Sequence, residues 1–196
     1  MEIYIVRHGE SVANDEWRLP TRDTPLTERG VKQAQTITEY LAGRVELIYS
    51  SPLTRAYQTA EIIGNGLGCP VVKMWDLRDM GYGELAGREY FDKRARRALR
   101  KAGPENPKYR IRGGGSFQGL QRRSDRALQR ILKSGKNSVA SVSHLETNRI
   151  LIARLLGRGL EDIHDVEQPN DLVYLFDTAT NSLQNIMDGN VEDGLW

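Results

Sequence analysis

Short apolar runs of β-forming residues alternate with helical patterns along this chain of 196 residues, and this alternation restricts its fold more than any other feature. The β-prone runs are Ile3–Val6, Val45–Tyr49, Val71–Met74, Val139–Val142 and Leu172–Phe176. Apolar residues at helical spacing fall between them. Strands that alternate with helices are typical of a layered α/β domain with a mostly parallel sheet. We therefore expect an α/β fold.

The predicted helices have recognisable beginnings and ends. They span Glu28–Leu41, Leu53–Ile63, Gly87–Ala102, Ser116–Leu132 and Leu145–Leu156. Thr27 is an N-cap candidate for the first helix, Pro52 suits the first turn of the second, and Gly157 ends the last. A chain of this length fits one domain. We expect residues 1–196 to form a single domain with a basic helical and loop insertion at about 87–115.

Polar residues with catalytic potential follow the predicted strands. Ligand sites in open α/β sheets lie outside the carboxyl ends of the strands. The residues in these positions are Arg7, His8, Arg55, Asp79, Glu84 and His144. Two of the chain's three histidines therefore lie at strand ends, whereas His164 is flanked by acids and is expected on the surface.

Two arginines and two histidines at one sheet edge suit a phosphoryl group. A guanidinium group stays charged and matches phosphate oxygens with a planar fork of donors. One neutral imidazole could form a covalent phospho-intermediate, and the other could stabilise the equatorial oxygens. A leaving alkoxide needs a proton from a carboxylic acid, for which Asp79 and Glu84 are candidates. Gly9 is expected to let the backbone turn close to the phosphate.

The sequence resembles the histidine phosphatase superfamily, in its phosphoglycerate-mutase-like branch 1, over nearly the whole chain. "RHGESVAN" (7–14) resembles the family signature. The other resembling segments, in the family's order, are "TPLTERGVKQA" (24–34), "SSPLTRAYQTAEII" (50–63), "LRDMGYGELAG" (77–87), "GGGSFQGLQRR" (113–123), "VSHLETNRIL" (142–151) and "QPNDLVYLFD" (168–177). The resemblance implies a three-layer α/β/α sandwich.

The resemblance also implies roles for individual residues. His8 would be the nucleophile that becomes phosphohistidine. The phosphate-binding groups would be Arg7, Asn14, Arg55 and His144. Asp79 stands at the position of the proton donor and would afterwards activate water. No metal or cofactor is implied, because the arginines compensate the phosphate charge.

This chain departs from the family pattern at three positions near the site. Asp79 stands where the family usually has glutamate, and Leu145 and Gly115 stand where it has glycine and glutamate. Asp79 is one methylene shorter than glutamate, which leaves Glu84 open as an alternative proton donor. Leu145 adds an apolar side chain to the pocket wall.

Residues 88–112 contain ten Lys or Arg against three acids, although the whole chain carries a formal net charge of only +2. Such a segregated basic segment suggests an anionic partner or substrate. A helix here would also place its arginines on a solvated outer face. Contact with a polyanionic substrate and simple solvation therefore remain alternatives. The glycine run Gly113–Gly115 is expected to act as a hinge.

The leading functional hypothesis is a metal-independent phosphomonoester hydrolase acting on a small, possibly polyanionic, phosphorylated substrate. A phosphoglycerate mutase-type phosphotransferase and a weakly active phospho-ligand-binding protein are alternatives. Binding of nucleic acid is the least favoured, because few aromatic residues accompany the basic segment. No apolar run is long enough for a membrane span, and one cysteine excludes an internal disulfide, so we expect a cytoplasmic protein. The sequence leaves the oligomeric state open.

Overall fold

The computed structural model describes residues 1–160 and 166–187, so His164 lies outside the described residues. Its centre is a six-stranded sheet with the order β3-β2-β4-β1-β5-β6. The strands are β1 (Glu2–Arg7), β2 (Leu47–Ser50), β3 (Val71–Lys73), β4 (Ser138–Ser143), β5 (Val173–Asp177) and β6 (Ser182–Asn185). The first four are mutually parallel, and β5 and β6 extend the sheet in antiparallel pairing. The sheet is thus mostly parallel, as predicted.

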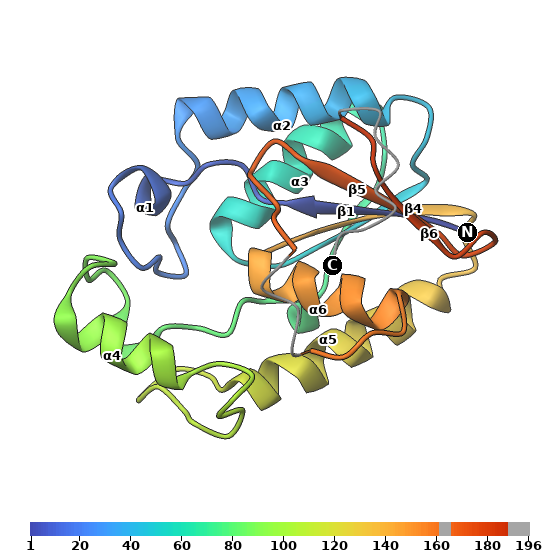
Figure 1. The fold of residues 1–196 in the computed structure, drawn as a ribbon. Helices are drawn as coiled ribbons and strands as arrows, with labels where there is room; N and C mark the ends of the chain where they lie inside the picture. The colour runs from blue at the N-terminus through green and yellow to red at the C-terminus, as the bar shows by residue number, and fades with distance from the viewer. Residues whose placement is uncertain (161–165, 188–196) are drawn as a thin grey trace.

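Helices cover both faces of the sheet and make a three-layer α/β/α arrangement (Figure 1). The helices α2 (Glu28–Leu41) and α3 (Thr54–Leu67) lie on one face, and α5 (Phe117–Leu132) and α6 (Leu145–Leu155) lie on the other. The short α1 (Val12–Asp15) and the basic α4 (Lys93–Lys101) lie beyond one end of the sheet. Two 3₁₀ turns, η1 (Trp75–Leu77) and η2 (Gly83–Leu85), link β3 to the region of α4.

Alternating side chains of β1 build the two cores. Ile3 and Ile5 join one buried cluster with residues of α5 and α6. Tyr4 and Val6 join the other cluster with residues of α2 and α3. Because both faces of a parallel sheet are covered, its central strands read as continuous apolar runs. This burial explains why β1 and β4 were visible in the sequence.

Element boundaries agree with the sequence where local signals are strong. The helix α2 spans the predicted residues, because the Thr27 side chain accepts a hydrogen bond from Gly30 N as the expected N-cap. The predicted helix from Gly87 begins only at Lys93, since Gly87 has a φ of 81° and Asp92 caps the first turn. The elements α1 and β6 were not predicted: one is four residues long and the other is a polar edge strand.

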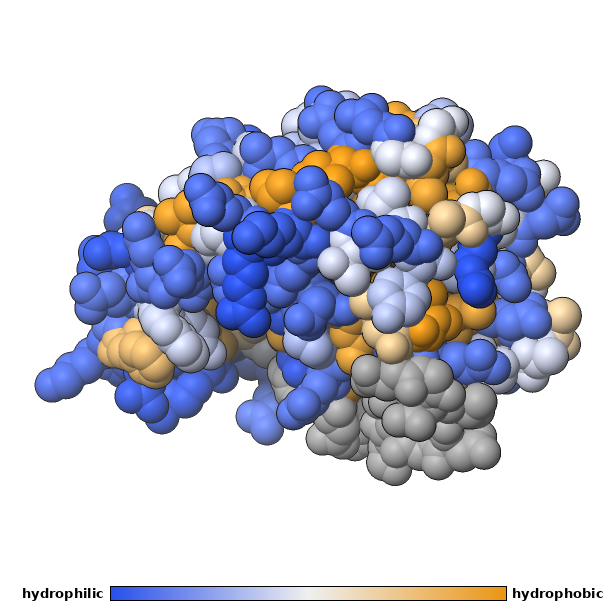
Figure 2. Space-filling view, turned by 90° about the horizontal axis from the view of Figure 1, so that it is seen from above, coloured by the Kyte–Doolittle hydropathy of each residue, from blue (hydrophilic) through white to orange (hydrophobic). Residues whose placement is uncertain are grey.

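The region around α4 has a small core of its own above the carboxyl edge of the parallel strands. Leu85, Ala95 and Ile111 pack there against Leu19, which comes from the loop after α1. Figure 2 shows a predominantly hydrophilic outer surface at the end of the molecule that carries α1 and α4. In the described part of the chain, no helix has the length and apolar character needed to cross a membrane.

Candidate active site

The two neighbouring parallel strands β1 and β4 bring His8 and His144 together. Their register pairs Arg7 with Ser143, so the next residue on each strand stands at the same edge of the sheet. The ring centroids of His8 and His144 lie 5.2 Å apart, and both side chains are buried. The strand-end prediction for these two residues agrees with their placement.

The hydrogen bonds of His8 define its tautomer. Its Nδ1 lies 2.8 Å from the carbonyl oxygen of Gly9, which can only accept a hydrogen bond, so Nδ1 carries the proton. Nε2 accepts a hydrogen bond from Arg55 Nε at 3.1 Å. Burial, together with the Arg55 and Arg7 guanidinium groups, holds the pKa of His8 well below its usual range. His8 is therefore neutral, with the lone pair of Nε2 directed into the site.

His144 is neutral in the opposite tautomer. Arg55 Nη2 lies 3.2 Å from Nδ1 and can only donate, so Nδ1 accepts. The proton sits on Nε2, which donates to Ser51 Oγ at 2.9 Å. Burial and the neighbouring Arg55 and His8 hold the pKa of His144 well below its usual range. Ser51 was not identified from the sequence as part of the site.

Arg55 connects the groups of the site. It occupies the first turn of α3, is 1% exposed, and donates to both histidines. Its Nη1 donates to Thr21 O at 3.1 Å, and its Nη2 lies 3.5 Å from Asp79 Oδ2. The guanidinium group therefore faces both imidazole rings and one carboxylate.

Arg7 offers a donor that none of the described residues uses. Its Nη1 donates to Gln168 O at 2.8 Å, whereas its buried Nε has no hydrogen-bond partner among the described residues. A buried donor without a partner costs free energy, and a phosphoryl oxygen in the adjacent cavity could satisfy it.

Amide side chains hold the end of β1 in place. Asn148 Nδ2 donates to Val6 O, and Asn170 Nδ2 donates to His8 O at 2.6 Å. Gln168 joins them, since its Nε2 donates to Ile5 O and its Oε1 accepts from Asn148. Sequence reasoning missed these three residues, because hydrogen bonds to backbone carbonyls leave no spacing pattern in the sequence.

Asp79 faces the site from the loop between the two 3₁₀ turns. Its Oδ1 accepts a hydrogen bond from Met80 N at 2.7 Å, and its Oδ2 faces Arg55. The backbone of this loop is held from α5, where Arg123 Nη2 donates to Asp79 O at 3.1 Å and to Arg78 O at 3.4 Å. Arg123 was also not recognised in the sequence.

The glycine run Gly113–Gly115 packs against this loop. A Cβ added at Gly115 would collide with Met80 O, and Gly115 N donates to Gly81 O at 3.3 Å. The two backbones can approach closely only because these residues lack side chains. That the run acts as a hinge stays a prediction; the structure shows that it also packs closely against this loop.

Glu84, the alternative proton donor, is turned away from the histidines. Its carboxylate pairs with Arg94 Nη2 at 2.9 Å on the exposed side of α4. Glu84 is not among the residues that line the cavity, whereas Asp79 is. Asn14 lines the cavity, but its Oδ1 accepts hydrogen bonds from Ser11 N and Ser11 Oγ in a capping box at the start of α1. Asn14 thus also shapes the loop after β1.

The absence of a side chain at Gly9 allows close packing, in addition to the approach of a phosphate that the sequence predicts. A Cβ at Gly9 would collide with the carbonyl oxygen of Gly30 in α2, and a Cβ at Gly30 would collide with Glu10 O. Gly9 N also donates to Thr59 Oγ1 at 3.0 Å. The loop after His8 is therefore pressed against the first turn of α2.

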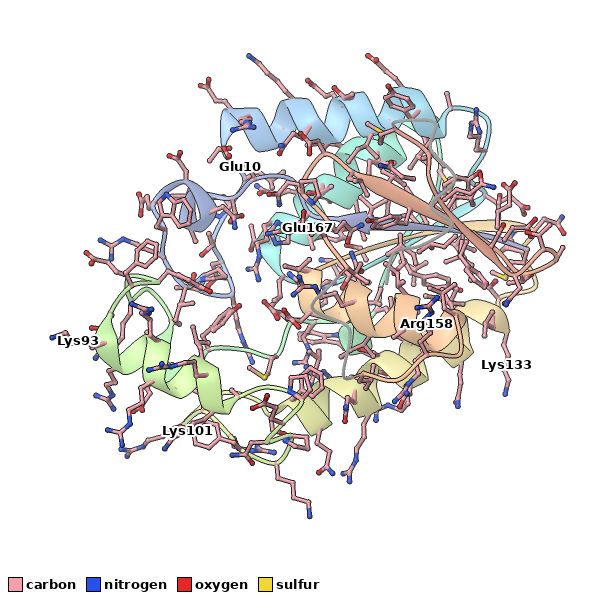
Figure 3. All side chains as sticks on the ribbon, viewed as in Figure 1. Glu10, Lys93, Lys101, Lys133, Arg158 and Glu167 are labelled. Carbon is pink, nitrogen blue, oxygen red and sulfur yellow. The ribbon has the colours of Figure 1, made fainter. Side chains whose placement is uncertain are left out.

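A cavity of about 960 Å³ extends from these groups toward α4. Its inner end is lined by Arg7, His8, Arg55, Asp79 and His144. Of the ten basic residues between 88 and 112, all within the described part of the chain, Arg100 is the one that lines the cavity. Figure 3 shows Lys93, at the start of α4, directed away from the rest of the molecule. Most of the basic segment therefore faces solvent.

The chain matches known proteins over most of its length. The family model of the histidine phosphatase superfamily (branch 1) matches residues 3–186. The Adenosylcobalamin/alpha-ribazole phosphatase of Escherichia coli K12 is 31% identical over 173 residues, covering 82% of each chain. A Cronobacter sakazakii protein named "Probable phosphoglycerate mutase GpmB" is 34% identical over 166 residues, covering 80% of this chain and 75% of that protein.

Solved structures show the same architecture. The alpha-ribazole phosphatase from Shigella flexneri superposes with a TM-score of 0.79 at 26% identity, covering 93% of both chains. The match in fold agrees with the match of the family model along the sequence. The chain belongs to branch 1 of the histidine phosphatase superfamily, and it is a phosphatase of that superfamily.

Proposed function

We propose that the protein hydrolyses phosphomonoesters through a phosphohistidine on His8, without a metal ion. The observation that carries this proposal is the fixed tautomer of His8: Gly9 O holds the proton on Nδ1, and the lone pair of Nε2 faces Arg55. A buried, neutral imidazole beside two arginines is suited to attack a phosphoryl group that those arginines bind.

In the first step, His8 Nε2 attacks phosphorus and the bond from phosphorus to the ester oxygen breaks. Without substrate, Arg55 donates hydrogen bonds to both histidines. When substrate binds, Arg55 donates to the phosphoryl oxygens instead, and the lone pair of His8 Nε2 becomes free to attack. Asp79 in its acid form donates a proton to the leaving oxygen. The phosphohistidine keeps its proton on Nδ1, and Gly9 O, which accepts from it, stabilises the positive charge of the ring.

In the second step, water replaces His8 on phosphorus. The Asp79 carboxylate accepts a proton from that water, the nitrogen–phosphorus bond breaks, and inorganic phosphate leaves. The His8 lone pair and the Asp79 acid are thereby restored. His144 contributes to charge stabilisation, since a bound phosphate dianion opposes the effect of Arg55 and favours the protonated ring.

The test uses a generic aryl phosphate in the presence of a chelator. We expect release of phosphate by the wild type, none by His8→Ala, and a ³²P-labelled, acid-labile enzyme intermediate that His8→Ala lacks. Asp79→Asn should form the label but turn over slowly. If the His8→Ala variant still acquires the ³²P label, the assignment of the nucleophile is overturned.

A mutase-type phosphotransferase is the second candidate, because one relative carries the name of a phosphoglycerate mutase. The two functions differ in the acceptor of the phosphoryl group. If a phosphoglycerate acceptor takes the label from His8 in preference to water, phosphoryl transfer to that acceptor is the main reaction and hydrolysis a side reaction. The proposal includes a small phosphorylated substrate and a cytoplasmic location. The location agrees with the presence of a single cysteine, Cys69, which cannot form an internal disulfide.

A further inference from the structure

The cavity is much larger than a phosphoryl group needs. At about 960 Å³ it lies at the upper end of the roughly 300–1,000 Å³ that small-molecule sites occupy. The arginines and histidines take up only its inner end. The outer part, between the Asp79 loop, α4 and the start of α6, is therefore available for the alcohol portion of the substrate.

Apolar side chains make most of the outer lining. They come from the Asp79 loop, α4, α5, α6 and the segment after α6: Met80, Tyr82, Leu99, Phe117, Leu145 and Leu160. Several of them also belong to the small cores below α4 and beside α5, so their positions are held by packing. A wall of this kind gains free energy by covering apolar surface of a ligand, and offers little to a sugar or an amino acid.

The charged residues of the outer cavity have partners of opposite charge in the lining or beside it. Arg149 Nη1 pairs with Glu146 at 2.8 Å, and its Nε donates to Val166 O. Arg18 pairs with Glu16 at 3.3 Å. Arg100 and Glu105 line the cavity as exposed residues of opposite charge. The outer cavity therefore has no dominant charge with which to select a second anionic group.

Leu145 brings the apolar lining close to the phosphoryl end. It follows His144 directly, begins α6, and lines the cavity with part of its surface exposed. The position is the one at which the resembling family has glycine. An alcohol bound at the site would therefore meet a leucine side chain within the first atoms beyond its ester oxygen.

We propose that the preferred substrates are phosphomonoesters whose alcohol carries an extended apolar body, which lies against Leu145, Met80 and Leu99. This inference rests on the proposed phosphatase function and adds the chemical class of the substrate. It gives the outer cavity the role of a hydrophobic specificity site. Small polar monoesters such as phosphoserine would leave this lining uncovered.

The experiment measures kcat/KM for a series of straight-chain alkyl phosphates from ethyl to octyl. The reactivity of the ester oxygen is nearly constant along the upper part of this series, so the trend reports binding of the chain. Each methylene group buried against the wall should raise kcat/KM by about fourfold. Phosphoserine should be a poorer substrate than the butyl ester. A flat series would overturn the proposal.

Two leucine variants provide the matched comparison. Leu145→Asn should flatten the dependence on chain length while hydrolysis of an aryl phosphate continues. Leu132→Asn is the control, since Leu132 is an exposed leucine of α5 outside the cavity lining, and its dependence should match the wild type. Thermal unfolding checks that both variants fold. The dependence of kcat/KM on chain length in the wild type decides the proposal even if Leu145→Asn does not fold.

The outcomes separate this inference from the function beneath it. Aryl phosphate hydrolysis with no preference for longer chains refutes the hydrophobic specificity site and leaves the phosphatase function standing. No hydrolysis of any ester, together with no labelling of His8, refutes both. A steep preference for phosphoserine over every alkyl ester also overturns the proposal, because it requires a polar outer site.

Discussion

Replacing Arg123 with methionine should impair Asp79, the proposed proton donor, without touching the proposed phosphate-binding groups. Arg123 Nη2 donates to Asp79 O at 3.1 Å, and its second bond, to Arg78 O at 3.4 Å, is weak. A hydrogen bond from a charged donor contributes about 1.5–3 kcal/mol. Because the Arg123 side chain is only part-buried, we take the lower end, about 1.5 kcal/mol. At about 1.4 kcal/mol per tenfold in rate, kcat/KM for an ester that needs a protonated leaving group should fall about tenfold.

The assay compares two leaving groups. An alkoxide needs a proton to leave, whereas a nitrophenolate leaves without one. Because water attack on the phosphohistidine is common to both esters, the comparison uses kcat/KM, which reports only the first step. Arg123→Met should therefore lower kcat/KM about tenfold for butyl phosphate and by less than about threefold for p-nitrophenyl phosphate. Asp79→Asn should show the same selectivity in a stronger form. Arg122→Met is the matched control, because Arg122 is the exposed neighbour on α5 and does not line the cavity.

Two results would refute this reasoning. An equal loss on both esters means that Arg123 supports the fold of the site in general rather than the position of the acid. Unchanged kcat/KM on butyl phosphate means that Asp79 keeps its place without this hydrogen bond. Thermal unfolding of both variants shows whether any loss of activity reflects a loss of folded protein.

The structure supports three more predictions. The folded protein holds the pKa values of His8 and His144 below that of an unfolded histidine, so the unfolded chain binds more protons as the pH falls. The contribution of these histidines to stability should be complete above about pH 6.5 and should fall below it by up to about 1.4 kcal/mol per pH unit for each histidine. The decrease in Tm between pH 7 and pH 5 should therefore be smaller in His8→Asn than in the wild type. Glu84→Gln should retain wild-type kcat on alkyl phosphates; abolished turnover would make Glu84 the proton donor. Gly9→Ala should cost about 1–3 kcal/mol in denaturant unfolding because its Cβ meets the backbone of α2, whereas Gly103→Ala, with open space around it, should be nearly neutral.

Much of the site could be predicted because its main residues follow strands. A buried parallel strand has a recognisable apolar run, and the residue after it must stand at the carboxyl edge. This rule is sufficient to bring His8 and His144 together, and the N-cap at Thr27 is sufficient to place the start of α2. In both cases a local pattern determines the position of the residue.

The remaining features depend on contacts that the sequence does not encode locally. Arg123 donates a hydrogen bond to the backbone carbonyl of Asp79, more than forty residues away, and a backbone acceptor requires no particular residue type at its position. The direction of Glu84 depends on Arg94, whose position follows from where α4 begins. The packing of Gly115 on the Met80 backbone likewise becomes visible only when both loops are in place.

The central position of β1 has a consequence for how the chain reaches its native state. Glu2 pairs with Ser138 on one side and with Asp177 on the other, so the strand that leads into His8 finds both neighbours far along the chain. Contacts of such large sequence separation slow folding, because a long loop must close before they form. During synthesis, the N-terminal strand must wait exposed until residues of β4 and β5 have been made. Until then, the apolar side chains and the unpaired backbone of β1 are the segment that a chaperone would be expected to shield.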